Sequence, residues 1–167
     1  MAVAPALAFA SVVWLALLIV TPLAPSSLAT LMYTAGAVVC HQIPERSFHL
    51  AGFQIPVCAR CLGIYAGAAA AASIHVLAGV VADSSHWRVL SPHAARVVFV
   101  LSAVPTLISL RLEWGGVWHG TNIDRAIAGI ALGAGGALVV MSAVATLHYS
   151  GCLRRRPIAP SRIPPPI

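Results

Sequence analysis

The sequence lacks lysine and contains only four acidic residues, so charge of either sign is scarce along its 167 residues. Charged residues make up 8% of the chain and hydrophobic residues 59%, whereas roughly a quarter of the residues of a soluble domain are charged. This scarcity excludes an ordinary soluble domain and predicts an integral membrane protein whose main partner is the lipid bilayer. The net charge of +6 comes from arginine alone and is concentrated near the C-terminus, which indicates orientation in the membrane and no nucleic-acid partner.

Apolar runs with few or no charges occur four times, and each is long enough to cross a bilayer. A membrane-spanning helix needs about 20 mostly apolar residues. We therefore predict spans at residues 5–23, 57–81, 91–112 and 122–148, with Ser91 as a cap and Pro92 as the first helical residue of the third. A cleaved signal peptide is the alternative for the first run, but no basic residue precedes it.

A fifth apolar run, residues 28–40, is too short to cross a bilayer unaided and leads into a polar loop. We predict a short interfacial or re-entrant helix here, followed by a sheltered loop up to Val57. The expected fold is an all-α integral membrane protein with four transmembrane helices and this additional helix. Residues 1–152 form one helical domain, and residues 153–167 form a basic, Pro-rich, disordered tail.

Arginines near the C-terminus predict the orientation, because basic residues accumulate on the cytoplasmic side. We expect a multi-pass protein of the cell membrane with a cytoplasmic C-terminus. The loop before the second span then faces the extracytoplasmic side together with the linker before the fourth. Faces rich in Gly and Ala allow homo-oligomers, but they serve packing within one chain equally well.

Chemistry is concentrated in residues 40–65, which contain three of the four cysteines. Cys58 and Cys61 form a C-x-x-C on the first turn of the second span, where the helix dipole and free N–H groups favour thiolate. Cys40 adds a third sulfur and His41 an imidazole. These four residues predict a tetrahedral site for zinc or another transition metal, with His41 as a ligand or as a supporting group.

Two alternatives use the same residues. Cys58 and Cys61 can form a redox pair, because thiols on the extracytoplasmic face meet an oxidising compartment. The cysteines can also be structural, since buried cysteine behaves as a small apolar residue. In that case the protein would bind a small molecule or a lipid headgroup elsewhere.

Arginines near the membrane suggest a site for an anionic small molecule or lipid headgroup, because guanidinium groups bind oxyanions with paired hydrogen bonds. Arg125 shares one helix stripe with Gly129, Gly133 and Gly136, so we expect it to face the interior and pair with a carboxylate such as Glu113 or Glu45. The residues that we assign to anion binding or to support of the cysteines are Gln42, Glu45, Arg46, Arg60, Tyr65, Asn122 and Arg125.

Many of these residues fall into one pattern: Cys40-His41-Gln42, residues 44–48, Gly52, residues 56–61, residues 63–65 and Gly67, with Thr121-Asn122, Arg125, Gly129 and Gly133 further on. The pattern resembles the signature of a family of small prokaryotic membrane proteins without an assigned function. Leu62 departs from it, since the family favours a small hydroxyl residue there. The resemblance implies a multi-span membrane protein built around these cysteines, and it implies no activity.

Overall fold

The computed structural model describes residues 3–81 and 90–154, with side chains described up to residue 147. Five α-helices make up most of this part of the chain: α1 (Val3–Val20), α2 (Ser26–Val39), α3 (Ala59–Val81), α4 (Pro92–Trp114) and α5 (Asn122–Arg154). Most of the polar connection predicted before the third span lies outside the described residues. So does the Pro-rich tail after residue 154.

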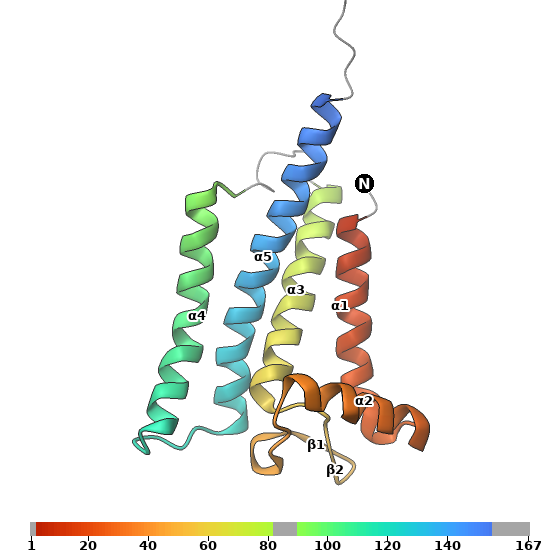
Figure 1. Ribbon diagram of the computed structural model, residues 1–167, viewed down its shortest axis with the longest axis vertical. Coiled ribbons are helices and arrows are strands. Elements are labelled where there is room, and N and C mark those ends of the chain that lie inside the picture. The colour runs from red at the N-terminus through yellow and green to blue at the C-terminus, as the bar shows by residue number, and fades with distance from the viewer. Residues whose placement is uncertain (1–2, 82–89, 155–167) are drawn as a thin grey trace, which may run out of the picture.

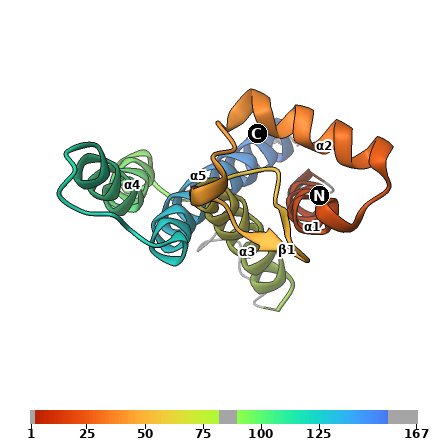
Figure 2. The ribbon, with the colours of Figure 1, turned by 90° about the horizontal axis from the view of Figure 1, so that it is seen from below.

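Four helical segments are long and apolar enough to cross a membrane: Val3–Leu23, which joins α1 to a short 3-10 turn, Ala59–Val81, Pro92–Trp114, and Asn122–Leu147 within α5. They run alongside one another (Figure 1). By contrast, α2 has only 14 residues and lies across one end of this bundle (Figures 1 and 2). The all-α fold predicted from the sequence, with four spans and a short helix before the loop, is therefore confirmed.

Capping side chains define where α4 and α5 begin. The hydroxyl of Ser91 accepts a hydrogen bond of 3.2 Å from an N–H in the first turn of α4, and Pro92 is the first helical residue, as predicted. Before α5, the hydroxyl of Thr121 accepts a bond from the N–H of Asp124 at 3.2 Å, while the Asp124 carboxylate accepts one from the Thr121 N–H at 2.9 Å. This reciprocal cap satisfies N–H groups that an open helix end leaves unpaired.

Glycines allow the backbones of α3 and α5 to touch. A Cβ atom added to Gly63 would lie 2.1 Å from the carbonyl oxygen of Ala126, and one added to Gly133 would lie 1.9 Å from that of Ile64. Only a residue without a side chain fits so close an approach. Gly136, which we predicted on the same stripe, differs. A Cβ there meets no described atom within 4 Å beyond its chain neighbours and the backbone of its own turn of helix, because three residues turn a helix about 60° short of a full turn.

The loop between α2 and α3 contains a hairpin that the sequence analysis did not predict. Its strands, β1 (His49–Leu50) and β2 (Phe53–Gln54), pair antiparallel. Ala51 and Gly52 form the turn with positive φ angles of 52° and 84°, as a type I′ hairpin turn requires. The hairpin reverses the chain, so the residues that precede α3 return to the end of α2.

The order of the helices brings the loop close to the linker between α4 and α5. α1 packs on α3, α3 packs on α5 and α5 packs on α4, so α3 and α5 form the centre of the molecule (Figure 2). The loop and the linker lie at the same end of the bundle (Figure 1). The side chain of Asn122, the first residue of α5, donates a hydrogen bond of 3.0 Å to the carbonyl of Ser47 in the loop. The loop is therefore held against the start of α5.

Candidate functional site

Three cysteines converge where α2 ends and α3 begins. Cys40 terminates α2, Cys58 directly precedes α3, and Cys61 lies in the first turn of α3. Their Sγ atoms all lie within 4.8 Å of one another. The backbone N–H of Cys58 also donates a hydrogen bond of 3.1 Å to the Sγ atom of Cys40. All three are free thiols, so the structure brings together the three sulfurs that we predicted as metal ligands.

Side-chain amides hold the loop against α2. Nε2 of Gln42 donates to the carbonyls of Tyr33 and Pro56, both at 2.8 Å. Nε2 of Gln54 donates to the carbonyl of Gln42 at 2.7 Å, and the hydroxyl of Tyr33 donates to the carbonyl of Gln54. Gln42 has a φ of 49°, a conformation that is uncommon for residues other than glycine. This network joins the end of α2 to the segment that leads into α3, and it therefore positions the cysteines.

The sulfurs lie in apolar surroundings. Cys40 is buried and the other two are partly buried. They pack against buried side chains from α1, α2 and the loop: Leu18, Met32, Ile55 and Val57. The hydrogen bond from the thiol of Cys61 lowers the pKa of Cys58 to about 5, although burial acts to raise it. A lowered pKa favours the thiolate, the form that binds metals and attacks disulfides.

Among the described residues, the imidazole that we predicted as a ligand, that of His41, does not join this group of sulfurs. His41 follows Cys40 directly, but it is exposed. Cys40 has extended backbone angles of −147° and 139°, and successive side chains of an extended chain point to opposite sides. His49 in β1 and His119 in the linker are exposed as well. Within the described part of the chain, the group able to hold a metal consists of the three thiols.

Two other predicted residues lie near the loop in different surroundings. Tyr65 packs in the apolar cluster around the cysteines, and its ring meets that of Trp14 edge to face, with centroids 6.1 Å apart and planes at 77°. Glu45 is exposed on the short 3-10 turn Pro44–Arg46. Tyr65 therefore belongs to the packing around the sulfurs, whereas Glu45 belongs to the surface.

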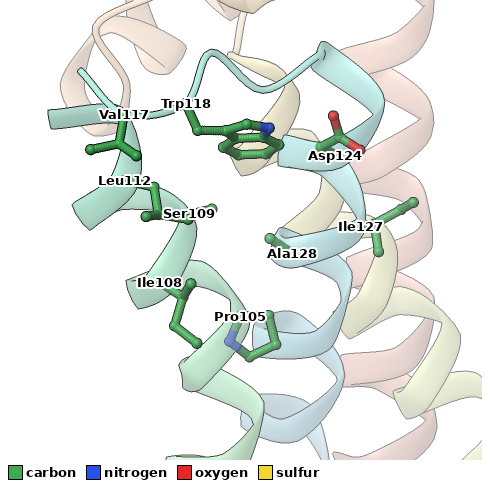
Figure 3. A pocket seen from close by; sticks show the side chains of 9 residues that line it. All are labelled: Pro105, Ile108, Ser109, Leu112, Val117, Trp118, Asp124, Ile127 and Ala128. Carbon is green, nitrogen blue, oxygen red and sulfur yellow. The ribbon is translucent and has the colours of Figure 1, made fainter. Parts of the chain in front are cut away.

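A cavity of about 480 Å³ lies between α4 and α5, on the other side of the bundle from the cysteines. The indole of Trp118 lies over one end of it, and Ile108 and Ala128 line its walls (Figure 3). The lining is mostly apolar, so the cavity suits apolar groups. Ser109 forms part of the wall and donates a hydrogen bond of 3.0 Å to the carbonyl of Thr106.

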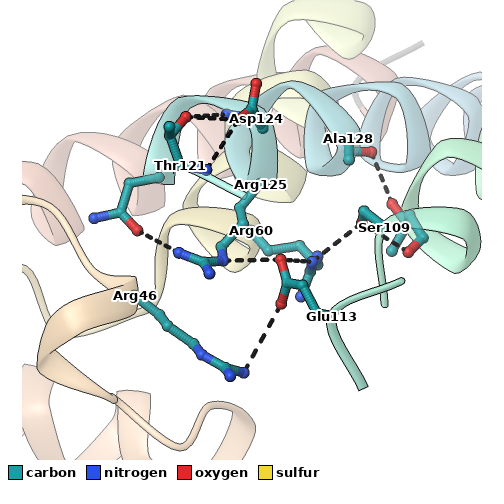
Figure 4. Close-up of polar contacts among 10 residues, drawn as sticks. Arg46, Arg60, Ser109, Glu113, Thr121, Asp124, Arg125 and Ala128 are labelled. Carbon is teal, nitrogen blue, oxygen red and sulfur yellow. Dashed lines mark hydrogen bonds and ion pairs between the residues drawn. The ribbon is translucent and has the colours of Figure 1, made fainter. Parts of the chain in front are cut away.

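Ser109 also contacts a group of charged side chains at the loop end of the bundle (Figure 4). Nη2 of Arg60 donates to the hydroxyl of Ser109 at 3.1 Å and to Oε1 of Glu113 at 3.2 Å. Nε of Arg125 donates to the same Oε1 atom at 3.0 Å. Nη1 of Arg46 lies 3.9 Å from the other carboxylate oxygen, Oε2. We refer to Arg46, Arg60, Arg125 and Glu113 as the arginine cluster.

Arg125 faces the interior and pairs with Glu113, as we predicted from the glycine stripe. Its Nη1 atom also donates to the side-chain oxygen of Asn122 at 3.0 Å. Glu113 itself was not among our site residues, because we placed it at the start of the linker. It lies instead in the last turn of α4, and its side chain is only 2% exposed. The scarcity of acidic residues, four in the whole sequence, was the signal that already indicated it as a partner of Arg125.

The first turn of α3 therefore contributes to two sites that lie on opposite faces of the helix. Cys58 and Cys61 face Cys40 and the apolar cluster of α1 and α2. Arg60 faces α4 and α5, where it meets Glu113. The backbone of this turn also touches α5, since a Cβ atom added to Gly129 would lie 2.2 Å from the carbonyl oxygen of Arg60.

Comparison with known proteins finds short similar segments in archaeal proteins. An uncharacterized protein of Methanocaldococcus jannaschii is 50% identical over 36 residues, which cover 22% of this chain and 23% of that protein. An uncharacterized protein of Methanothermobacter thermautotrophicus is 57% identical over 30 residues, which cover 18% of this chain and 27% of that protein. The chain thus matches about a quarter of the length of these relatives. No solved structure matches it.

The family comparison covers much more of the chain. A family model described as "Predicted membrane protein" matches residues 40–139. This range is more than half of the sequence, and it contains the three convergent cysteines and the whole arginine cluster. The membrane character inferred from the four apolar helices agrees with that description. The chain therefore belongs to the family described as Predicted membrane protein (DUF2085).

Proposed function

We propose that the protein is a membrane metal-binding protein in which Cys40, Cys58 and Cys61 coordinate one zinc ion. The observation that carries the proposal is the convergence of the three Sγ atoms, each within 4.8 Å of the others. Zinc–sulfur bonds of about 2.3 Å in a tetrahedron place sulfurs about 3.8 Å apart. Small rotations about the Cα–Cβ bonds are therefore sufficient to close the site around the ion.

Three thiolate ligands leave a fourth position on a tetrahedral ion. Water or an external ligand fills that position in zinc sites that react with other molecules. His41 is adjacent to Cys40 but exposed, so it serves as the fourth ligand only if the loop rearranges. The site that we propose thus has an exchangeable position at one end of the bundle. Soft thiolate ligands suit zinc, and they also suit Cu(I).

The test is elemental analysis of the full chain, purified in detergent under reducing conditions without chelator. We expect about one zinc per chain, as for a single three-thiolate site. The variants Cys58→Ser and Cys61→Ser should each reduce the ratio to near zero, because they remove a ligand. Cys152→Ser is the matched control, since Cys152 lies near the far end of α5, and it should keep the full zinc content.

A metal content near zero in the unmodified protein, unchanged by these substitutions, would contradict the metal proposal. A thiol–disulfide function would then be the second candidate, favoured by the Sγ atoms of Cys58 and Cys61, which lie within 4.8 Å of each other. In this reaction the two thiols form a disulfide and release two protons and two electrons, which a partner disulfide accepts to become a dithiol. Alkylation gel shifts on cells would then show Cys58 and Cys61 changing state together.

The amide network predicts that Gln42 supports the metal site without touching the ion. Gln42→Ala removes the two hydrogen bonds that join the end of α2 to the segment before α3. We expect zinc affinity to fall about 10- to 100-fold, the usual effect of removing a group that orients metal ligands. Competition with a chromogenic chelator measures the affinity. His49→Ala, at an exposed position of the same loop, is the control, and equal affinities of the two variants would exclude this role of Gln42.

A further inference from the structure

The arginine cluster contains more positive charge than its carboxylate can balance. Arg46, Arg60 and Arg125 come from three separate segments and surround the single side chain of Glu113. Three guanidinium groups and one carboxylate give the cluster a net charge of +2. The side chains of Arg60 and Arg125 are only 12% and 11% exposed, so water screens this excess poorly.

Hydrogen bonding within the cluster is also incomplete. Among the described residues, the buried atoms Nε of Arg60 and Oε2 of Glu113 lack a hydrogen-bond partner. The 3.9 Å between Arg46 and Oε2 is too long for a hydrogen bond. Each guanidinium has five N–H donors. Those of Arg60 find only two acceptor groups among the described residues, the hydroxyl of Ser109 and the carboxylate of Glu113. Buried polar groups are rarely left in this state unless a ligand, ion or water satisfies them.

The position of Arg46 provides a route of access. Arg60 and Arg125 are held by helices, but Arg46 lies on the loop and its side chain is 42% exposed. Its guanidinium stands at the outer side of the cluster in Figure 4, facing Glu113 across the loop end of the bundle. A small change of its side-chain rotamer would open the cluster to the solvent or to the lipid headgroups.

We propose that the arginine cluster binds a phosphate-type oxyanion, supplied either by the headgroup of an anionic lipid or by phosphate free in solution. Such an anion offsets the charge of +2, and its oxygens accept bonds from the unpaired Nε–H of Arg60 and from the N–H groups of Arg46. Oε2 of Glu113 is an acceptor, so water or a protonated oxygen of the anion must donate to it. Three guanidinium groups that approach from three segments suit a tetrahedral group of oxygens better than a planar carboxylate, which offers two. This site is separate from the proposed zinc site, and each site has its own readout.

Thermal unfolding of the full chain in detergent tests the proposal. We expect sodium phosphate to raise the melting temperature above that in sodium chloride of equal ionic strength, because a ligand that binds only the folded state stabilises it. Arg46→Gln should weaken the apparent phosphate affinity about tenfold or more, as expected for the loss of a charge-assisted contact. Arg46→Lys should keep part of the phosphate affinity. Arg111→Gln, which removes an exposed arginine outside the cluster, should behave as the unmodified protein.

Nanodiscs distinguish the two sources of the anion. We compare phosphatidylcholine discs with and without phosphatidylglycerol, an anionic lipid. If phosphatidylglycerol raises the melting temperature of the unmodified protein but not that of Arg46→Gln, the ligand is a lipid headgroup. Stabilisation by phosphate alone identifies a soluble anion. Equal melting temperatures in all conditions, or an equal response of Arg46→Gln and Arg111→Gln, would overturn the proposal. A monodisperse gel-filtration peak shows that each variant is folded. Zinc content measured in parallel distinguishes failure at this site from failure at the cysteines.

Discussion

Alanine in place of Gly133 is expected to destabilise the protein strongly, because the added Cβ atom would lie 1.9 Å from the carbonyl oxygen of Ile64. That oxygen belongs to the backbone of α3 and cannot rotate away, so the two central helices must separate. Overpacked cores lose about 1–3 kcal/mol and sometimes more, and a collision with backbone belongs at the upper end, about 3 kcal/mol. Unfolding in mixed detergent micelles at increasing dodecyl sulfate measures the loss.

Gly136→Ala is the matched control on the same helix. Beyond its chain neighbours and the backbone of its own turn of helix, no described atom lies within 4 Å of a Cβ atom at this position, and alanine favours a helix over glycine by about 1 kcal/mol. Its stability should therefore equal or exceed that of the unmodified protein. If both alanine variants unfold at the same detergent composition, the close contact between α3 and α5 is not what stabilises the bundle.

Glu113→Gln is the second substitution with a large expected effect. It leaves Arg60 and Arg125 almost fully buried without a negative charge. Removing one partner of a buried ion pair typically costs about 3–5 kcal/mol, because the remaining charge is desolvated and unpaired. We expect the free energy of unfolding to fall by about 3 kcal/mol, measured by the same detergent titration.

Two further variants identify the cause of that loss. Glu45→Gln neutralises an exposed carboxylate on the loop and should change stability little. The double variant Glu113→Gln with Arg125→Gln should recover part of the loss, because it removes one of the unpaired charges. If the double variant loses more unfolding free energy than the two single variants lose together, the ion-pair explanation is wrong. If the cluster binds oxyanions, phosphate should stabilise Glu113→Gln more than the unmodified protein, since the charge of its pocket is higher.

The transmembrane architecture could be predicted because the bilayer imposes a length on every apolar run. The 14 residues of α2 were too few to cross a bilayer, and the helix indeed lies across the bundle end. The cap at Ser91 could be predicted for a similar reason, since a hydroxyl before Pro92 is a local signal. Such features depend on neighbouring residues alone, and they do not require knowledge of distant contacts.

The hairpin and the burial of Glu113 in the last turn of α4 were not predicted, although its pairing with Arg125 was. Strands of two residues are too short to show an alternating pattern, and Ala51 gives no sign that it adopts a positive φ. Glu113 precedes a tryptophan and two glycines, which suggested a linker, but α4 continues to Trp114. Its burial results from the approach of Arg60 and Arg125 on other helices, and single-chain periodicity contains no information about that approach.

The sites themselves were predicted unevenly. Convergence of Cys40 with Cys58 followed from the density of reactive residues in one short segment. The separation of His41 from the sulfurs could not be predicted in this way, because it depends on the extended conformation of Cys40. The hydrogen bond from the side chain of Gln54 to the carbonyl of Gln42 depends on the hairpin. Because the hairpin was not predicted, this bond could not be predicted either.

Arg60 and Cys61 are neighbours in the first turn of α3, and this has a thermodynamic consequence for the two proposed ligands. Each ligand that holds this turn in place lowers the conformational entropy that the other must remove on binding. Linkage requires that the metal then raises the affinity for the anion by the same factor by which the anion raises the affinity for the metal. The helix start would in this way make the occupancy of a metal site sensitive to the surrounding lipid or phosphate, although the two ligands never meet.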